Sequence, residues 1–157
     1  MLEIERKFLV SSEAYKALAI KQYQIVQGFL NSNPERVVRV RIRDDKGFLT
    51  VKGKSDISGL TRFEWETEIP LADAENLLKI CEKGIIEKIR YEVIFEGKTF
   101  EVDEFFGNNK GLTVAEIELQ DKLETFKRPA WLGEEVTGQT KYYNSNLIEN
   151  PYMNWDK

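Results

Sequence analysis

The chain has 157 residues, which favours one domain (residues 1–157), and its hydrophobic content of 41% is enough for a sizeable core. Acidic residues outnumber basic residues by 27 to 23, so the net charge is -4, which argues against a general nucleic-acid binder. The absence of histidine excludes histidine bases, histidine metal ligands and Ser-His-Asp triads, and the single cysteine excludes disulfide frameworks and multi-cysteine zinc sites.

Alternation of apolar and polar residues with a period of two dominates the chain and predicts β-strands. Several of these segments are joined by short turns such as Asp44-Asp45-Lys46-Gly47, where glycine suits a left-handed position. The predicted strands are 2–10, 24–31, 36–43, 48–54, 61–69, 86–95, 98–105 and 113–120. Runs of strands with short connections and few helices indicate an antiparallel barrel or sandwich.

Helical patterns are short and lie between the strands. Tyr15, Leu18 and Ala19 predict a first helix, with Ser11 or Ser12 as its N-cap. A second helix is indicated by an apolar stripe with i, i+3, i+4, i+7 spacing, preceded by a good capping residue. That stripe is Ala74, Leu77, Leu78 and Cys81, and the capping residue is Asp73.

The segment after the last predicted strand is harder to interpret. Residues 122–127 and 140–149 are each interpreted as a short helix, and residues 129–138 as a loop between them. Cys81, the only cysteine, is interpreted as a core residue of the second helix.

Seven of the predicted strands place charged side chains on one face and apolar side chains on the other, because successive side chains of a strand point to opposite faces. The simplest interpretation is a two-faced sheet with its charged face in water. Charges of the same sign repeat ~7 Å apart within many strands, however, which gains nothing on a solvated face. The series is Glu3-x-Glu5-x-Lys7, Arg39-x-Arg41, Lys52-x-Lys54, Arg62-x-Glu64-x-Glu66, Lys88-x-Arg90, Glu101-x-Asp103 and Glu116-x-Glu118.

A closed barrel with these charged faces pointing inward is the second interpretation. Its interior charges would have to pair, stay hydrated or bind an ionic ligand, because burying them unpaired costs too much free energy. Separate groups of acids and bases suit a polyphosphate bound with a divalent metal. Acidic groups hold Mg²⁺ or Mn²⁺ through oxygen, and Arg and Lys bind phosphate oxygens.

As an ordered set, from Glu3 to about residue 148, this series resembles the CYTH superfamily, also called the triphosphate tunnel metalloenzymes. The segments 135–138 and 143–147 also resemble the C-terminal part of short bacterial members. The resemblance implies a mostly β (α+β) fold: an eight-stranded antiparallel closed barrel with helices packed outside and a short C-terminal helix. It also implies hydrolysis, or in some members cyclisation, of a triphosphate with a divalent cation.

The resemblance further implies a role for each charged residue. The expected ligands of Mg²⁺ or Mn²⁺ are Glu3, Glu5 and Glu118. The expected catalytic residues, which orient the attacking water or contact the reacting phosphate, are Glu116, Glu118 and Lys7. The expected substrate-binding residues are Lys7, Arg39, Arg41, Lys52, Lys54, Arg62, Lys88, Arg90 and Lys141. The expected supporting acids are Glu64, Glu66, Glu101 and Asp103.

Hydrolysis of inorganic tripolyphosphate is the leading functional hypothesis. Hydrolysis of nucleoside or thiamine triphosphate, conversion of ATP to cyclic AMP by a class IV adenylyl cyclase, and non-catalytic polyphosphate binding are alternatives. The glutamates oppose the binding module, because carboxylates without metal repel phosphate.

The expected partner is a small-molecule triphosphate, with no nucleic acid and no membrane. No apolar run approaches the ~20 residues of a membrane span, and the charged N-terminus differs from a signal peptide, so a cytoplasmic protein is expected. Outward-facing Phe63, Trp65, Tyr91 and Phe100 are expected to pack against helices. Apolar strand faces that the helices leave uncovered make a homodimer possible.

Overall fold

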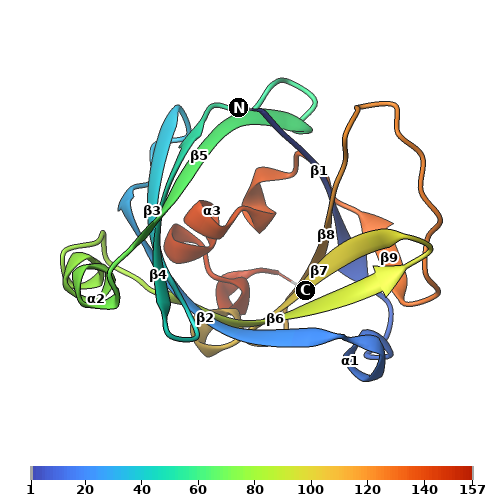
Figure 1. The fold of residues 1–157 in the computed structure, drawn as a ribbon, viewed down its shortest axis with the longest axis horizontal. Coiled ribbons are helices and arrows are strands. Elements are labelled where there is room, and N and C mark those ends of the chain that lie inside the picture. The colour runs from blue at the N-terminus through green and yellow to red at the C-terminus, as the bar shows by residue number, and fades with distance from the viewer. Residues whose placement is uncertain (1, 157) are drawn as a thin grey trace.

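The computed structural model describes residues 2–156, which form nine strands in one antiparallel sheet that closes into a barrel (Figure 1). Eight strands make the barrel and the ninth is an addition at its seam, so the predicted eight-stranded antiparallel barrel is confirmed. The strands are β1 (Leu2–Val10), β2 (Lys21–Asn31), β3 (Arg36–Arg43), β4 (Lys46–Gly53), β5 (Thr61–Ile69), β6 (Ile86–Phe95), β7 (Lys98–Phe105), β8 (Thr113–Glu118) and β9 (Leu132–Glu135).

The barrel closes through its first strand. The strands follow the order β5-β4-β3-β2-β6-β7-β8-β1-β9, and an additional pairing of β1 with β5 completes the ring. That pairing is short, since it joins only residues 2–4 to residues 61–63. Further along β1, β9 takes over the same edge, so one edge of β1 meets two short partners rather than one long strand.

The described helices are α1 (Tyr15–Leu18), α2 (Leu71–Lys79) and α3 (Asn144–Glu149), with three 3₁₀ turns at 107–109, 140–142 and 152–154. Asp73 was predicted to be the N-cap of α2, and this is wrong, because Asp73 lies in the first turn of the helix. Pro70 is the cap residue, and its carbonyl accepts a hydrogen bond from the Ala74 N–H. Ala14 rather than a serine caps α1, although the Ser12 hydroxyl accepts a hydrogen bond from the Ala14 N–H.

Three expectations for the C-terminal part are wrong. Residues 122–127 form no helix, and Phe126 packs against Phe8 and Phe100 on the barrel wall. Residues 129–138 are not all loop, because β9 lies within them. Residues 140–149 are not one helix, since Tyr143 has an extended backbone and separates a 3₁₀ turn from α3.

Two covers close parts of the outer barrel wall. α1 and the segment 121–131 cover β1, β6, β7 and β8, where Tyr91 and Phe100 are buried against Tyr15 and Trp131. α2 covers β3 and β4. The helix can approach β4 closely because Gly47 has no side chain: a Cβ atom at this position would lie 2.6 Å from the Cβ of Ala74. Tyr91 therefore packs against helix α1, as predicted, whereas Phe100 packs against Phe126 and Trp131, which belong to no helix.

The outer face of β5 has no such cover. Phe63 and Trp65 are 46% and 49% exposed, and Leu2, the β1 partner of Phe63, is 68% exposed. The prediction that these two aromatic side chains pack against helices is wrong, because α2 lies over β3 and β4 instead.

The C-terminal segment, residues 136–155, fills one end of the barrel interior. Figure 1 shows α3 within the ring of strands, whereas α1 and α2 lie outside it. The inward side chains at this end are apolar and pack against the segment. This buried cluster comprises Ile86, Phe105, Leu112, Val114, Val136, Tyr142 and Leu147. In the described part of the chain, no helix is long and apolar enough to cross a membrane.

Candidate active site

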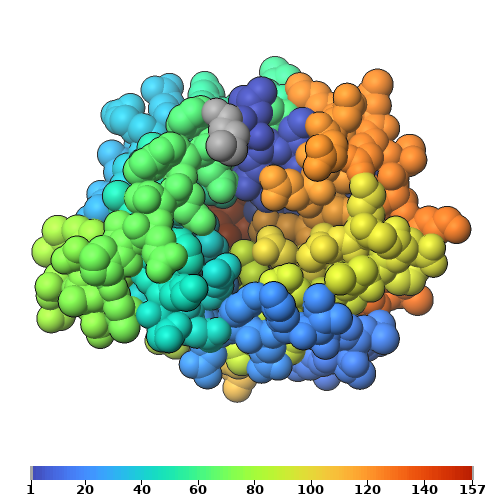
Figure 2. Space-filling view, in the orientation of Figure 1, coloured from blue at the N-terminus to red at the C-terminus, as the bar shows by residue number. Residues whose placement is uncertain are grey.

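The other end of the interior is a charged cavity of about 280 Å³. Figure 2 shows a hollow in the centre of one face of the molecule, with the C-terminal segment at its bottom. The cavity is lined by these predicted residues: Glu3, Glu5, Lys7, Arg39, Arg41, Lys52, Arg62, Glu64, Glu66, Lys88, Arg90, Glu101, Glu116 and Glu118. The strand alternation thus brings most of the predicted site together.

The register of the sheet explains which charges become neighbours. Glu5 lies opposite Glu118, and Lys7 lies opposite Glu116. Glu116 also lies opposite Glu101 on its other side. Neighbouring strands therefore place a patch of acids on β1, β7 and β8, and the basic residues come mainly from β3 and β6.

Burial within this acidic patch drives neighbouring carboxyl groups apart in pKa. Burial, together with the charges of Glu116 and Glu3, raises the pKa of Glu5 well above its ordinary value. Burial alone would also raise the pKa of Glu116, but the charge of Lys7 and a hydrogen bond from Glu5 lower it to about 2. Glu5 and Glu116 are therefore a pair in which ionisation of one carboxyl group opposes ionisation of the other.

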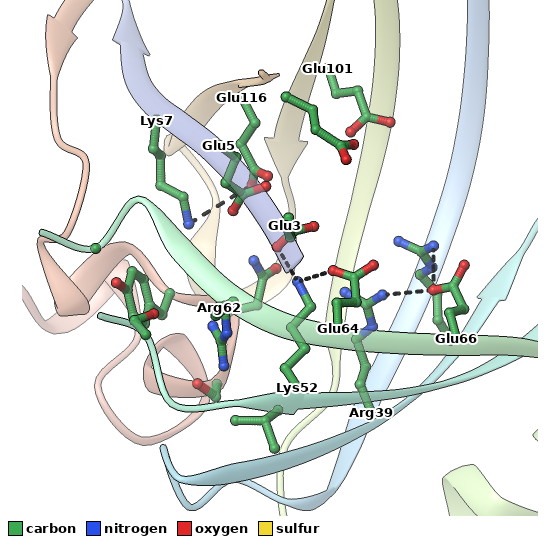
Figure 3. Close-up of a pocket in the computed structure, with 18 of the residues that line it drawn as sticks. Glu3, Glu5, Lys7, Arg39, Lys52, Arg62, Glu64, Glu66, Glu101 and Glu116 are labelled. Atoms are coloured by element: carbon green, nitrogen blue, oxygen red, sulfur yellow. Dashed lines mark hydrogen bonds and ion pairs between the residues drawn. The ribbon is translucent and has the colours of Figure 1, made fainter. Parts of the chain in front are cut away.

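A second pair of carboxyl groups shares a proton beside Lys52. Burial and a hydrogen bond to Glu64 raise the pKa of Glu3 to about 8. Burial would raise the pKa of Glu64 as well, but the hydrogen bond from Glu3 and the charge of Lys52 lower it to about 2. The Lys52 Nζ lies 3.4 Å from Glu3 and 3.2 Å from Glu64. Dashed lines mark both ion pairs in Figure 3.

These carboxyl groups fit a divalent cation by their chemistry. Each shared proton marks a place where two carboxylates cannot both be ionised, and a cation can replace that proton. Carboxylate oxygen is also the ligand that Mg²⁺ and Mn²⁺ prefer. Among residues 2–156, no three acids lie close enough to hold one ion together. Burial and the charges of Glu64 and Glu101 raise the pKa of Glu118, which also lines the cavity.

The arginines of β3 share one carboxylate on β5. Arg39 and Arg41 each place a terminal nitrogen near Glu66 Oε2, at 3.2 Å and 3.4 Å, and the Thr50 hydroxyl donates to the same oxygen at 2.6 Å. Burial and the nearby charges of Arg39 and Arg90 lower the pKa of Arg41 to about 9. One acid therefore holds two cations, which leaves positive charge in excess on this side of the cavity.

Asp103 is buried beside the cavity and holds the two cations of β6. Its carboxylate lies 2.8 Å from the Lys88 Nζ and accepts two hydrogen bonds from Arg90, at 2.8 Å and 2.9 Å. Although burial would raise the pKa of Asp103, Arg90 and Lys88 hold it well below its ordinary value. Burial lowers the pKa of Lys88 to about 8. Asp103 itself does not line the cavity.

Two predicted substrate-binding lysines lie outside the cavity. Lys54 is exposed, because β4 ends at Gly53 rather than at residue 54 as predicted. Lys141 is exposed too, and its Nζ lies 4.7 Å from the centre of the Trp155 ring. By contrast, Arg43 lines the cavity, with its guanidinium over the ring of Phe48.

Several uncharged residues of the site have no counterpart in the predicted set. Gln27 is buried on β2 and donates a hydrogen bond to Asn144. Thr137, Tyr143 and Asn144 belong to the C-terminal segment and line the cavity. The charge pattern could not indicate them, and the resemblance at 135–138 and 143–147 was the only sequence signal in this region.

A closed barrel whose interior is lined by acidic and basic side chains from several strands is typical of proteins that bind an ionic ligand inside the barrel. A family model for the CYTH domain matches residues 1–152, so the chain belongs to the CYTH domain family. This confirms the resemblance seen in the strand motifs.

The chain is similar to proteins with a known activity. It is 53% identical over 154 residues to an inorganic triphosphatase from Acetivibrio thermocellus, which covers 98% of this chain and 97% of that protein. It is 34% identical over 151 residues to an inorganic triphosphatase from Nitrosomonas europaea, covering 94% of this chain and 97% of that protein. A crystal structure of an inorganic triphosphatase aligns with a TM-score of 0.67 and 32% identity, over 93% of each chain.

Proposed function

We propose that this protein is a metal-dependent inorganic triphosphatase that hydrolyses tripolyphosphate to phosphate and pyrophosphate. The observation that carries the proposal is one cavity of about 280 Å³ that is lined by both acidic and basic side chains. The names of the relatives from Acetivibrio thermocellus and Nitrosomonas europaea support the same activity.

The basic side of the cavity suits a chain of phosphates. Phosphoryl transfer depends on positioning and charge neutralisation more than on covalent chemistry by the protein. Arg39, Arg41 and Arg90 present guanidinium groups that can bind phosphate oxygens through two nitrogens. With Lys52 and Lys88 they would neutralise the substrate and the pyrophosphate that leaves.

The acidic side suits Mg²⁺ or Mn²⁺, held by Glu3, Glu5 and Glu118. When bound, the ion supplies Lewis-acid polarisation of the phosphate oxygens. Glu116 is ionised at neutral pH because its pKa is about 2, so its carboxylate can orient the attacking water. Lys7, whose Nζ lies 3.9 Å from Glu116, would contact the phosphate under attack. We place this reaction in the cytoplasm, without nucleic-acid or membrane partners.

The test is phosphate release from tripolyphosphate, ATP and thiamine triphosphate, with Mg²⁺, Mn²⁺ or a chelator. We expect fast, metal-dependent hydrolysis of tripolyphosphate that Glu5→Gln reduces by about 100-fold or more, since metal binding contributes several kcal/mol. Glu87→Gln, which removes an exposed acid of β6, is the matched control and should retain activity.

Other outcomes would replace the proposal with one of its alternatives. Conversion of ATP to cyclic AMP would indicate a cyclase, and preferential hydrolysis of ATP or thiamine triphosphate would change the substrate. Tight binding of tripolyphosphate without turnover would indicate a binding module.

We further propose that the uncovered face of β5 joins two copies of this chain. The outward side chains of β5 carry no charge, and Phe63 and Trp65 form an apolar patch with Leu2. A two-fold interface places a surface against its own copy, so a patch without charges avoids repulsion between identical residues.

Light scattering measures the size of the particle in solution. We expect a dimer of the unaltered chain and a monomer after Trp65→Lys, whereas Ile80→Lys, at an exposed site beyond α2, should remain dimeric. A monomeric unaltered chain would refute the dimer.

A further inference from the structure

The cations of the cavity fall into two groups according to what holds them. Arg39 and Arg41 share Glu66, Lys52 lies between Glu3 and Glu64, and Lys88 and Arg90 share Asp103. The second group is Lys7 and Arg62. Among residues 2–156, Glu116 at 3.9 Å is the one carboxylate within 4.0 Å of the Lys7 Nζ, and no carboxylate lies within 4.0 Å of the Arg62 guanidinium.

An aromatic ring contacts both cations of this second group. The Lys7 Nζ lies 4.9 Å from the centre of the Tyr143 ring, and the Arg62 guanidinium carbon lies 5.9 Å from it. Arg62 is fixed at its other end by a hydrogen bond from its Nε to the Gly53 carbonyl, at 3.1 Å. One ring of the C-terminal segment therefore contacts two cations on two different strands.

The local backbone places this ring at the bottom of the cavity. Tyr143 is the extended residue between the 140–142 turn and α3. Next to it, the loop before β5 and the loop after β9 touch at Gly59 and Gly138, which both have positive φ angles. A Cβ atom on Gly59 would lie 2.3 Å from the Cα of Gly138, so only glycine permits this approach.

Asn144, the residue after Tyr143, also contacts a cation, Lys88, through an uncharged side chain. The Asn144 Oδ1 accepts a hydrogen bond from the Lys88 Nζ at 3.0 Å and one from Gln27 at 3.1 Å. The start of α3 thus contacts three cavity cations through neutral groups. A ring or an amide fixes the position of a cation but leaves its charge intact, whereas a carboxylate cancels it.

We propose that Tyr143 is a positioning residue for substrate binding: its ring holds Lys7 and Arg62 in place without cancelling the charge of either side chain. The inference rests on the proposed function, since it concerns the binding of tripolyphosphate in the same cavity. It assigns the C-terminal segment a part in recognising the anion in addition to filling the barrel.

The test separates the ring from its hydroxyl group. Tyr143→Leu removes the ring, and we expect KM for tripolyphosphate to rise about tenfold with kcat changed by less than about threefold, because cation–π contacts are modest. Tyr143→Phe keeps the ring, and its KM should stay within about twofold of the unaltered protein.

Tyr142→Leu is the matched control for loosening of the segment. Tyr142 is the neighbouring residue, but its ring lies in the apolar cluster against Trp155. We expect this variant to lower Tm without raising KM. An unchanged KM in Tyr143→Leu, an equal rise in Tyr143→Phe, or an equal rise in Tyr142→Leu would each overturn the proposal.

Calorimetry with tripolyphosphate distinguishes this inference from the proposed function. If the unaltered protein binds tripolyphosphate but does not hydrolyse it, the triphosphatase fails while the Kd values of the Tyr143 variants still test the ring. If hydrolysis is confirmed and the Tyr143→Leu variant binds as tightly as the unaltered protein, only the inference fails.

Discussion

The two ends of the barrel interior are built from different residues on the same inward face of the same strands, and they differ in chemistry. On β1, Glu3, Glu5 and Lys7 line the cavity, whereas Leu9, two residues further, packs against the apolar cluster. On β6 the change falls between Lys88 and Ile86. Alternation decides which face a side chain occupies, and the residue type decides what can fill the space next to it.

The difference shows how the protein divides its interior. Apolar side chains gain free energy when the chain itself covers them, so the C-terminal segment fills their end. Charged side chains cannot be buried unless they are paired, and here the pairing is incomplete, because Arg62 contacts a neutral ring and no carboxylate of residues 2–156 lies within 4.0 Å of its guanidinium. The charged end therefore remains a cavity for an ionic ligand.

We expect the largest effect on the charged end of the interior from a substitution of Asp103. Asp103→Asn leaves Lys88 and Arg90 buried without their shared carboxylate, and we expect the free energy of unfolding to fall by about 3–5 kcal/mol. Urea denaturation measures the loss. Tripolyphosphate should restore part of it, because the anion supplies the missing charge. A variant as stable as the unaltered protein would contradict the assigned role of Asp103.

The apolar end should respond to loss of volume instead of loss of charge. Leu147→Ala removes a fully buried side chain of α3, and we expect it to lower the free energy of unfolding by about 3 kcal/mol. Urea denaturation again measures the effect, and here tripolyphosphate should not selectively restore stability. Equal rescue of both variants by the anion would show that the two ends are not distinct.

Metal binding at the charged end should strengthen as pH rises. Burial and a hydrogen bond to Glu64 raise the pKa of Glu3 to about 8, so this carboxyl keeps its proton at neutral pH. A divalent cation must displace that proton, so its affinity should rise about tenfold per pH unit and level off above about pH 8. Calorimetric titration with Mg²⁺ from about pH 6 to about pH 9 measures this slope.

The raised pKa of Glu3 also determines how the stability of the metal-free protein changes with pH. Between the ordinary value of 4.5 and the raised pKa of about 8, the folded chain keeps the Glu3 proton while the unfolded chain releases it. Stability should therefore fall as pH rises through this window, and Glu3→Gln should flatten both dependences. A metal affinity that does not change with pH would contradict the shared proton.

The smallest effects are expected for the two lysines outside the cavity. Lys54→Ala and Lys141→Ala should change KM for tripolyphosphate by less than about twofold, since both side chains are exposed to solvent. Steady-state kinetics checks this, with Arg62→Ala as the comparison that should raise KM. A large effect at Lys141 would indicate that it moves into the cavity when substrate binds.

Sequence alternation predicted the strands and most of the cavity lining because the period of two is a property of the strand itself. The closed barrel was implied by the resemblance to the CYTH superfamily, since alternation alone also allowed a two-faced sheet. It failed where a strand ends: Lys54 continues the pattern of Lys52, but β4 stops at Gly53. It also failed for Phe63 and Trp65, because alternation gives the face of a side chain but not the position of the helix that would cover it.

The C-terminal segment could not be predicted as the filling of the barrel. Its elements are too short to show a clear period, and Tyr143 interrupts the helix that residues 140–149 were expected to form. Its contributions to the site, Tyr143 and Asn144, act through a ring and an amide, which no pattern of charges reveals. Only the packing of the finished barrel identifies them.

The position of β1 has a consequence for how the chain folds. The first nine described residues pair with β5, β8 and β9, and Arg6 on this strand pairs with Glu135, a separation of 129 residues. Contacts between residues so far apart are slow to form, because a long loop must close before they stabilise anything. On the ribosome the first strand is made early but must wait for its partners, so most of the chain must be synthesised before the ring can close.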